Sequence, residues 1–244
     1  ASAKVIHDIA APEIEGDFLV FGRAGDELAA NALYEFASAL NADPGLDMIY
    51  ADESHAAGRS SRSEPFIKPD WSPDYLETFN YVGHPACFRI SLARACAPNA
   101  GYYDFVLRFT ELTGKIHHVR RMLLHRPGGH ASVNRAQRGA DLSALAGRLQ
   151  RTGRAGTVRP GAVEGCYELV VDIKERPLVS IIIPTAGRTV DFEGRRIDLV
   201  VNCVSQVLER STYGNKEIII VDNGDLAPEK RHALEQLGCR LITF

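Results

Sequence analysis

The sequence predicts an α/β fold with a mainly parallel sheet flanked by helices. Two short runs rich in β-branched residues, 177–185 and 217–225, each end in a polar turn, a pattern typical of buried parallel strands. Between them, the apolar residues of segment 197–209 recur at steps of three and four, which indicates a helix. A strand, a helix and a second strand in this order form a parallel β-α-β unit.

The polar turns that follow these two strands are candidate ligand positions. Pro184 and Thr185 end the first strand, and Asp222 and Asn223 end the second. In open α/β sheets the ligand crevice lies at the carboxyl ends of the strands, so all four residues are predicted to face it. A carboxylate and an amide suit the base or ribose of a nucleotide. The alternative is that Pro184 and Asn223 only shape turns.

The segment before residue 130 contains further regular elements. Apolar residues such as Leu33, Phe36 and Leu40 recur at helical spacing after an acidic start, so a helix is expected at 26–40. The elements expected after it are a strand at 47–50, an ordered loop over the crevice at 53–74, short helical pieces at 88–95 and 104–113, and a strand at 116–125.

Residues 131–176 are expected to form a connector. A helix is predicted at 141–151, where Leu142, Leu145 and Leu149 share one face. Alternating residues then predict a hairpin from segments 156–160 and 166–173. Further along, residues 187–196 are expected to be a loop insertion, and residues 241–244 the start of a third strand.

Composition excludes several classes of protein. The formal charge of −3 gives no electrostatic case for nucleic-acid binding, and no apolar run approaches the roughly 20 residues of a membrane span. The five cysteines are odd in number and have no Cys-x-x-Cys spacing, so neither a zinc site nor a redox pair is indicated. Buried free thiols in a reducing cytoplasm are expected, with a peripheral position at the inner membrane as an alternative.

The two strand motifs resemble a known family. Ser180-Ile-Ile-Ile-Pro-Thr185, a helix, and Ile219-Ile-Val-Asp-Asn-Gly224 look like the opening of family-2 glycosyltransferases, whose GT-A fold, a Rossmann-like mixed fold, binds a nucleotide sugar in this crevice. Six segments of the first half resemble the later portion of the same family, in the family's order. They are Gly16-Asp-Phe-Leu-Val-Phe21, Asp47-Met-Ile-Tyr-Ala-Asp-Glu53, Phe66-Ile-Lys-Pro-Asp-Trp-Ser-Pro-Asp74, Asn80-Tyr-Val-Gly-His84, Tyr103-Asp-Phe-Val-Leu-Arg108 and Ile116-His-His-Val119.

The order of the two halves is reversed relative to a complete enzyme of the family. The resemblance therefore implies two partial domains of a tandem protein: residues 1–130 as the metal and acceptor half of a degenerate glycosyltransferase-like domain, 131–176 as the connector, and 177–244 as the nucleotide-binding half of a second domain. The alternative is that the two halves pack together as one permuted domain.

The resemblance also implies a divalent cation, Mn²⁺ or Mg²⁺, held by an Asp-x-Asp turn at the departing diphosphate. In this chain the turn falls on residues 23–25, and only the following Asp26 offers a carboxylate. One carboxylate holds such a cation poorly, and its alternative role is to cap a helix. His125 is a second candidate metal ligand, with a structural hydrogen bond as the alternative.

The family's general base would fall on Tyr102, which is a poor base. Asp104 is the candidate replacement if its carboxylate points into the crevice, and an ion pair with Arg108 is its alternative role. On the acceptor side, Trp71 is positioned to stack on a sugar ring or to fill the core beneath the loop. Asp70 or Asp74 is expected to bind sugar hydroxyls on this side, and Asp52, which follows a strand end, is predicted to face the crevice.

The function implied is transfer of a sugar from a UDP, GDP or dTDP sugar to a glycan acceptor, in the assembly of a bacterial surface polysaccharide. The alternative is a catalytically degenerate module that binds glycan or serves as a scaffold. Loss of the Asp-x-Asp turn and of the acidic base favours the alternative. The sequence therefore does not decide whether this segment transfers sugar.

Overall fold

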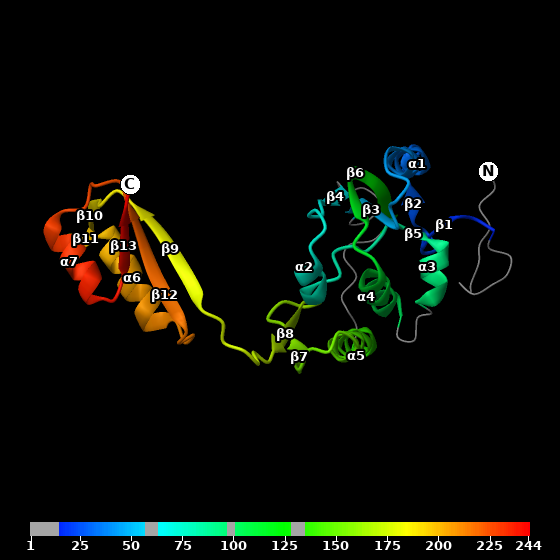
Figure 1. The fold of residues 1–244 in the computed structure, drawn as a ribbon. Helices are drawn as coiled ribbons and strands as arrows, with labels where there is room; N and C mark the ends of the chain where they lie inside the picture. The colour runs from blue at the N-terminus through cyan, green and yellow to red at the C-terminus, as the bar shows by residue number, and fades with distance from the viewer. Residues whose placement is uncertain (1–14, 57–62, 97–100, 128–134) are drawn as a thin grey trace. The chain divides into compact units, whose positions relative to one another are not determined.

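The structure is a computed structural model that describes residues 15–56, 63–96, 101–127 and 135–244. It contains two compact units, Ala1–Asp172 and Ile173–Phe244 (Figure 1). The boundary between them falls inside the segment predicted as a connector. No described helix combines the length and the apolar composition that a membrane span requires.

A six-stranded sheet forms the centre of the N-terminal unit, with strand order β1-β5-β3-β6-β2 and with β4 paired to β3. Its strands are β1 (Phe18–Val20), β2 (Glu27–Leu28), β3 (Met48–Ala56), β4 (Ser63–Phe66), β5 (Ala86–Arg89) and β6 (Ile116–Pro127). Among the described residues β3 and β6 form the one parallel pair of this sheet. The sheet is therefore mixed, and the prediction of mainly parallel pairing does not describe this unit. Consecutive strands such as β3 and β4 pair antiparallel across a short connection, whereas a parallel pair needs a long crossover.

Helices cover both faces of this sheet, because successive residues of a strand point to opposite faces. Met48 and Tyr50 of β3 pack in one hydrophobic cluster with α4 (Tyr102–Leu112). The residues between them and after them, Ile49 and Ala51, pack in a second cluster with α1 (Ala32–Ala42). Figure 1 shows α1 on one side of the sheet and α4 on the other. The remaining helices of this unit are α2 (Pro73–Thr78), α3 (Ile90–Ala95) and α5 (Arg135–Arg151).

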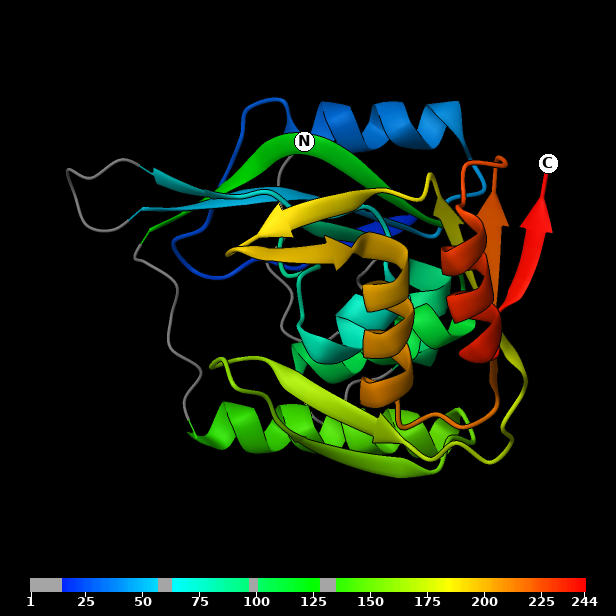
Figure 2. The same cartoon turned by 90° about the vertical axis from the view of Figure 1, so that its left-hand side faces the viewer.

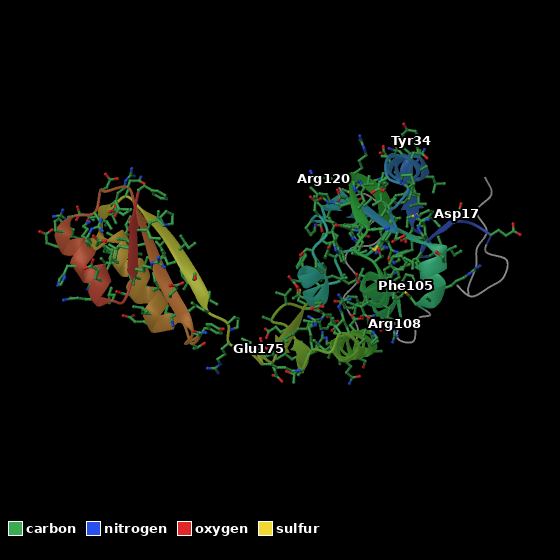
Figure 3. The ribbon with its side chains drawn as sticks, in the orientation of Figure 1. Asp17, Tyr34, Phe105, Arg108, Arg120 and Glu175 are labelled. Atoms are coloured by element: carbon green, nitrogen blue, oxygen red, sulfur yellow. The ribbon has the colours of Figure 1, made fainter. Side chains whose placement is uncertain are left out.

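The side chains follow the same division between core and surface. Phe105 of α4 points into the larger cluster, whereas Tyr34 of α1 and Arg120 of β6 point outward (Figure 3). Three local predictions are wrong in detail. The helix predicted from residue 26 begins at Ala32, after β2; β4 lies inside the segment predicted as a loop; and β5 takes the first residues of the helical piece predicted at 88–95.

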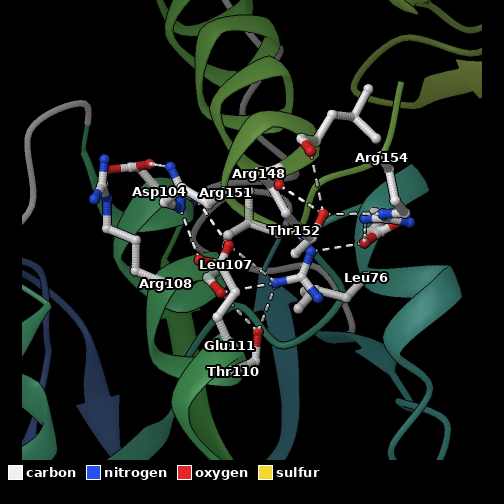
Figure 4. Close-up of polar contacts among 12 residues, drawn as sticks. Leu76, Asp104, Leu107, Arg108, Thr110, Glu111, Arg148, Arg151, Thr152 and Arg154 are labelled. Atoms are coloured by element: carbon white, nitrogen blue, oxygen red, sulfur yellow. Dashed lines mark hydrogen bonds and ion pairs between the residues drawn. The ribbon is translucent and has the colours of Figure 1, made fainter. Parts of the chain in front are cut away.

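The predicted connector helix and hairpin belong to the N-terminal unit, and the helix, α5, begins at Arg135, before the predicted residue 141. The hairpin is formed by β7 (Gly156–Pro160) and β8 (Tyr167–Val171), and it lies alongside α5 (Figure 2). Leu145 of α5 and Tyr167 of β8 belong to the larger hydrophobic cluster. Buried Arg148 fixes the helix further, since it donates to Glu77 Oε1 at 2.6 Å and to the Leu107 carbonyl at 2.8 Å (Figure 4).

The C-terminal unit contains the β-α-β arrangement that the sequence predicts. Its three strands pair in parallel in the order β13-β12-β9. The elements of this unit are β9 (Val179–Thr185), β10 (Thr189–Phe192), β11 (Arg195–Asp198), α6 (Leu199–Arg210), β12 (Lys216–Asp222), α7 (Pro228–Gln236) and β13 (Arg240–Thr243). The loop insertion expected at 187–196 is in part the β10–β11 hairpin. The strand expected from residue 241 is β13.

Both helices of the C-terminal unit pack on one face of its sheet. Ile220 of β12 is fully buried in a cluster with Val204 of α6 and Leu234 of α7. The opposite face carries Ile182 of β9, which is 64% exposed, and Ile242 of β13, which is 37% exposed. The expectation that the first strand is buried is therefore wrong for β9, which is an edge strand with one exposed face.

Candidate functional site

The N-terminal unit contains a small polar cavity, here named the crevice pocket, with a volume of about 190 Å³. It lies near the carboxyl ends of the parallel strands β3 and β6, where a ligand crevice is expected. Its lining also includes the turn before β2, the start of α4 and the loop before β5. The lining residues are Arg23, Glu53, His55, Phe66, Phe79, Asn80, Gly83, His84, Tyr102 and Arg126. Arg23 and Tyr102, the positions that the resemblance aligns with the metal turn and the general base, thus lie in one pocket.

Asp26, the remaining carboxylate of the metal turn, is ion-paired. Arg126 Nε donates to Asp26 Oδ1 at 3.0 Å, and the backbone N–H of Arg23 donates to Oδ2 at 2.9 Å. Burial raises the pKa of the Asp26 carboxyl, but the hydrogen bonds from Arg126 and Arg23 and the charge of Arg126 outweigh burial and leave the pKa below its ordinary value. Asp26 is therefore an anion whose charge is balanced by Arg126. It makes no helix cap, since β2 follows it.

His125, the second predicted metal ligand, makes a structural hydrogen bond. Its Nδ1 lies 2.8 Å from Ser54 Oγ, across the β3–β6 pair. Within the described ranges no group of three or more His, Cys, Asp or Glu side chains is arranged to hold a metal ion. The side chains around Asp26 and His125 do not fit a divalent cation, because the Asp26 carboxylate is neutralised by Arg126.

A buried ion network lies beneath the pocket. Lys68 Nζ donates to the carbonyls of Val82 and His84, both at 2.7 Å, and lies 3.4 Å from Glu53 Oε1. Arg126 Nη1 lies 3.4 Å from the other oxygen of Glu53. Burial lowers the pKa of the Lys68 ammonium to about 8, although Glu53 and Asp52 act to raise it. Lys68 is thus mostly charged at neutral pH, and it ties β3 to the loop that carries His84.

Tyr102 does not fit the role of a general base. Its hydroxyl donates to the Gly83 carbonyl at 2.6 Å, and burial, with a smaller contribution from Glu53, raises its pKa well above the ordinary value. The ring of His84 stacks on the Tyr102 ring, with centroids 4.3 Å apart. His84 Nδ1 lies 3.1 Å from the Phe21 carbonyl. Because a carbonyl oxygen only accepts, Nδ1 carries the proton and His84 Nε2 offers a lone pair.

Asp104 lies outside the lining of the crevice pocket. Its carboxylate is 2% exposed and accepts a hydrogen bond from Arg108 Nε at 2.7 Å, with Arg151 Nη1 at 3.9 Å (Figure 4). This ion pair with Arg108, on the next turn of α4, is the alternative role expected for Asp104. The predicted catalytic role for Asp104 is therefore not supported by its position.

The three acceptor-side candidates have different surroundings. Asp52 is buried, where its Oδ1 accepts from the Lys68 backbone N–H and lies near His118 Nε2, both at 2.9 Å. Trp71 is partly buried against the larger hydrophobic cluster, which agrees with its core-filling alternative. Asp74 is exposed in the first turn of α2. The register of β3 with β6 shifts at Asp52, and such a bulge re-aims the neighbouring side chains.

Trp71 also lines an open groove of about 950 Å³ between α1 and β6, here named the α1–β6 groove. Within it, Asp70 pairs with Arg120 and lies 3.2 Å from His118 Nδ1. The hydrogen bonds from Arg120 and His118 lower the pKa of Asp70 to about 2. The groove is lined by Glu35, Ser38, Ala39, Ala42, Asp70, Trp71, Ile116, His117, His118, Val119, Arg120 and Arg121.

The four nucleotide-binding candidates lie together at the carboxyl ends of β9 and β12, as predicted, where Pro184 is opposite Val221 and Thr185 is opposite Asp222. Pro184 and Thr185 line a cavity of about 230 Å³. Asp222 is fully buried, and its Oδ1 accepts from the backbone N–H groups of Asp225 and Leu226 while Oδ2 accepts from Arg231. Asn223 is exposed. Asp222 therefore closes its own turn, and the two candidates that line this cavity are Pro184 and Thr185.

Lys68 and His84 are the site residues that sequence reasoning missed. Both lie inside segments that carry the family resemblance, yet nothing in those segments marks either side chain as buried. The partners of Lys68 are 14 and 16 residues away along the chain, so only the folded loop reveals its role. Lys68 and His84 are therefore identified as site residues only from the folded structure.

No protein-family model matches the chain. It is similar to the O-antigen biosynthesis protein RfbC of Myxococcus xanthus, with 34% identity over 236 residues, which cover 91% of this chain and 18% of that protein. It is also similar to the uncharacterized protein y4gI of Sinorhizobium fredii, with 32% identity over 216 residues, which cover 82% of this chain and 23% of that protein. The chain thus spans about a fifth of the length of each of these two relatives.

Proposed function

We propose that this chain is part of a glycosyltransferase-like protein of bacterial surface polysaccharide biosynthesis, and that its N-terminal unit is a glycan-binding module without metal-dependent transfer activity. The name of the Myxococcus xanthus relative supports the pathway. The family-2 motifs and the mixed α/β sheet support a GT-A ancestry for this unit. The five cysteines, all free thiols, support a cytoplasmic location.

The observation that carries the proposal is the ion pair of Asp26 with Arg126. Transfer from a nucleoside diphosphate sugar requires fixed positive charge at the departing diphosphate. Here the charge of Arg126 is divided between Asp26 and Glu53, so it is largely neutralised before any ligand arrives. A general base is missing from its expected position as well, since the Tyr102 hydroxyl is committed to the Gly83 carbonyl. These residues suit binding better than turnover.

A second candidate function is sugar transfer that uses the C-terminal unit. The cavity beside Pro184 and Thr185 lies where a nucleotide would bind in a doubly wound sheet. In this alternative the C-terminal unit binds a UDP, GDP or dTDP sugar, and a glycan accepts the sugar. A divalent cation would then be bound by residues other than Asp26 and His125.

The two candidates are separated by calorimetry and an activity assay on the 244-residue chain. The chain is titrated with neutral oligosaccharides and with UDP, GDP and dTDP, and donor consumption is followed with UDP-, GDP- and dTDP-linked sugars. The module predicts heat from an oligosaccharide and no donor consumption. Donor consumption that Thr185→Val abolishes and that the exposed control Asn215→Ala leaves intact would select the transferase.

A further inference from the structure

His84 Nε2 and Glu53 Oε2 are buried acceptor atoms of the crevice pocket for which the described residues offer no hydrogen-bond partner. His84 is 4% exposed and Glu53 is 4% exposed. Arg126 Nη1 lies 3.4 Å and His55 Nε2 lies 3.7 Å from Glu53 Oε2, and neither contact is a hydrogen bond. Buried polar atoms are nearly always hydrogen-bonded, so two such atoms in one cavity indicate an absent donor.

Both atoms can only accept. The contact of His84 Nδ1 with the Phe21 carbonyl fixes the proton on Nδ1, and burial lowers the pKa of His84 to about 4, with smaller contributions from Arg126 and Arg23. The imidazole is therefore neutral at physiological pH, with a lone pair on Nε2. Glu53 is a carboxylate paired with Lys68 and Arg126. The ligand that satisfies these two atoms must supply two donors.

The rest of the pocket restricts the chemistry of that ligand. A phosphate dianion has no proton to donate, so it cannot satisfy either of these two acceptors. A metal cation is disfavoured because Lys68 and Arg126 already neutralise Glu53. The rings of Phe66 and Phe79, with centroids 6.0 Å apart, supply apolar surface, and an aromatic ring suits the apolar face of a sugar. At about 190 Å³ the cavity is smaller than the roughly 300 Å³ at which pockets for drug-sized ligands begin.

We propose that the crevice pocket binds a single neutral sugar residue, two hydroxyl groups of which donate hydrogen bonds to His84 Nε2 and Glu53 Oε2. Binding requires neither a metal nor a nucleotide. The inference rests on the proposed glycan-binding function and assigns it to these two atoms. It also sets the specificity, since a sugar that lacks either hydroxyl leaves one acceptor buried and unpaired.

The test uses the chain labelled with ¹⁵N-histidine, because three histidines report on three places. His84 reports on the crevice pocket, exposed His117 on the α1–β6 groove and exposed His232 on the C-terminal unit. The chain is titrated with the methyl glycosides of glucose, galactose, mannose and rhamnose in EDTA. The expected result is an upfield shift of the unprotonated His84 nitrogen with one of them, while His117 and His232 stay unchanged. The matched deoxy glycoside is expected to bind at least about tenfold more weakly.

His84→Phe assigns the resonance and tests affinity, since it keeps the ring stacked on Tyr102 and removes the acceptor. Its glycoside affinity is expected to fall at least about tenfold. If this variant does not fold, the shift in the unmodified chain remains the deciding measurement. Glycoside binding that moves only His117 would overturn this inference and leave the glycan-binding function standing. Absence of any heat or shift, with water alone in the pocket, would overturn both.

Discussion

The two units of this chain both bury a carboxylate at the carboxyl end of a parallel strand, but they neutralise it in different ways. In the N-terminal unit, Glu53 of β3 is paired with Lys68 and with Arg126, which are distant in sequence. In the C-terminal unit, Asp222 of β12 is held by two backbone N–H groups of its own turn and by Arg231 of the next helix. The comparison shows that the partners of an acidic residue at a strand end decide whether its carboxylate is available to a ligand.

The largest expected effect comes from removing the long-range partner in the N-terminal unit. Lys68→Met leaves Glu53 with Arg126 as its remaining cation and leaves two buried carbonyls without their donor, so the free energy of unfolding should fall by roughly 3–5 kcal/mol. Arg231→Met is the matched change in the C-terminal unit and should cost clearly less, because the turn still binds Asp222. Urea unfolding followed by Trp71 fluorescence, the signal of the only tryptophan, and by circular dichroism measures both. Equal losses of unfolding free energy in the two variants would contradict the difference between the two units.

The open face of the C-terminal sheet gives the next effect. Ile220→Ala removes a fully buried side chain and should cost about 2–5 kcal/mol. Ile182→Ala, in the neighbouring strand, changes a side chain that is 64% exposed and should cost less than about 1 kcal/mol. Both are measured by urea unfolding under circular dichroism. A loss at Ile182 as large as that at Ile220 would mean that this face is covered.

Acid should destabilise the N-terminal unit through His84. Burial lowers the folded-state pKa of His84 from 6.5 to about 4, so between these values the unfolded chain binds the extra proton. Above pH 6.5 His84 is neutral in both states, so its protonation does not lower the free energy of unfolding. As the pH falls toward 4, protonation of the unfolded chain lowers the free energy of unfolding by at most about 3 kcal/mol. Unfolding at a series of pH values, monitored by Trp71, should give a slope in this window that His84→Phe flattens. If the slope were unchanged in the variant, a group other than His84 would account for the proton taken up on unfolding.

The smallest effect is expected at the exposed pair in the α1–β6 groove. The hydrogen bonds from Arg120 and His118 hold the pKa of Asp70 at about 2, so Arg120→Ala should raise that pKa toward its ordinary value while stability stays nearly unchanged. A carboxyl-detected NMR titration measures it. If the pKa stayed at about 2, His118 alone would account for the shift.

Helices and strands with a strong apolar periodicity could be predicted from the sequence. Elements that are stabilised mainly by pairing with a neighbouring strand could not. The β-α-β unit, the connector helix and the hairpin follow from local patterns. Strand β4 and the β10–β11 hairpin were missed because their short segments are polar, and their pairing partners stabilise them. Helix α7 was missed as well, since only Leu234 of this mostly polar helix is buried.

Some contacts of the candidate site could likewise be predicted from the sequence, and others could not. The proximity of Thr185 and Asp222 could be predicted, because neighbouring parallel strands end at one edge of the sheet. The pairing of Asp26 with Arg126 could not, because the two residues are 100 positions apart and only the β2–β6 pairing brings them together. The same limit applies to the lone pair of His84, which depends on a contact with the distant Phe21 carbonyl.

The most direct test of the central claim, that Arg126 neutralises the residual metal turn, is calorimetric titration of UDP with and without Mn²⁺ into the unmodified chain and into Asp26→Asn. The neutralised turn predicts that Mn²⁺ changes the heat of UDP binding in neither protein. Mn²⁺-dependent UDP binding in the unmodified chain that is lost in Asp26→Asn would contradict the claim and restore Asp26 as a metal ligand.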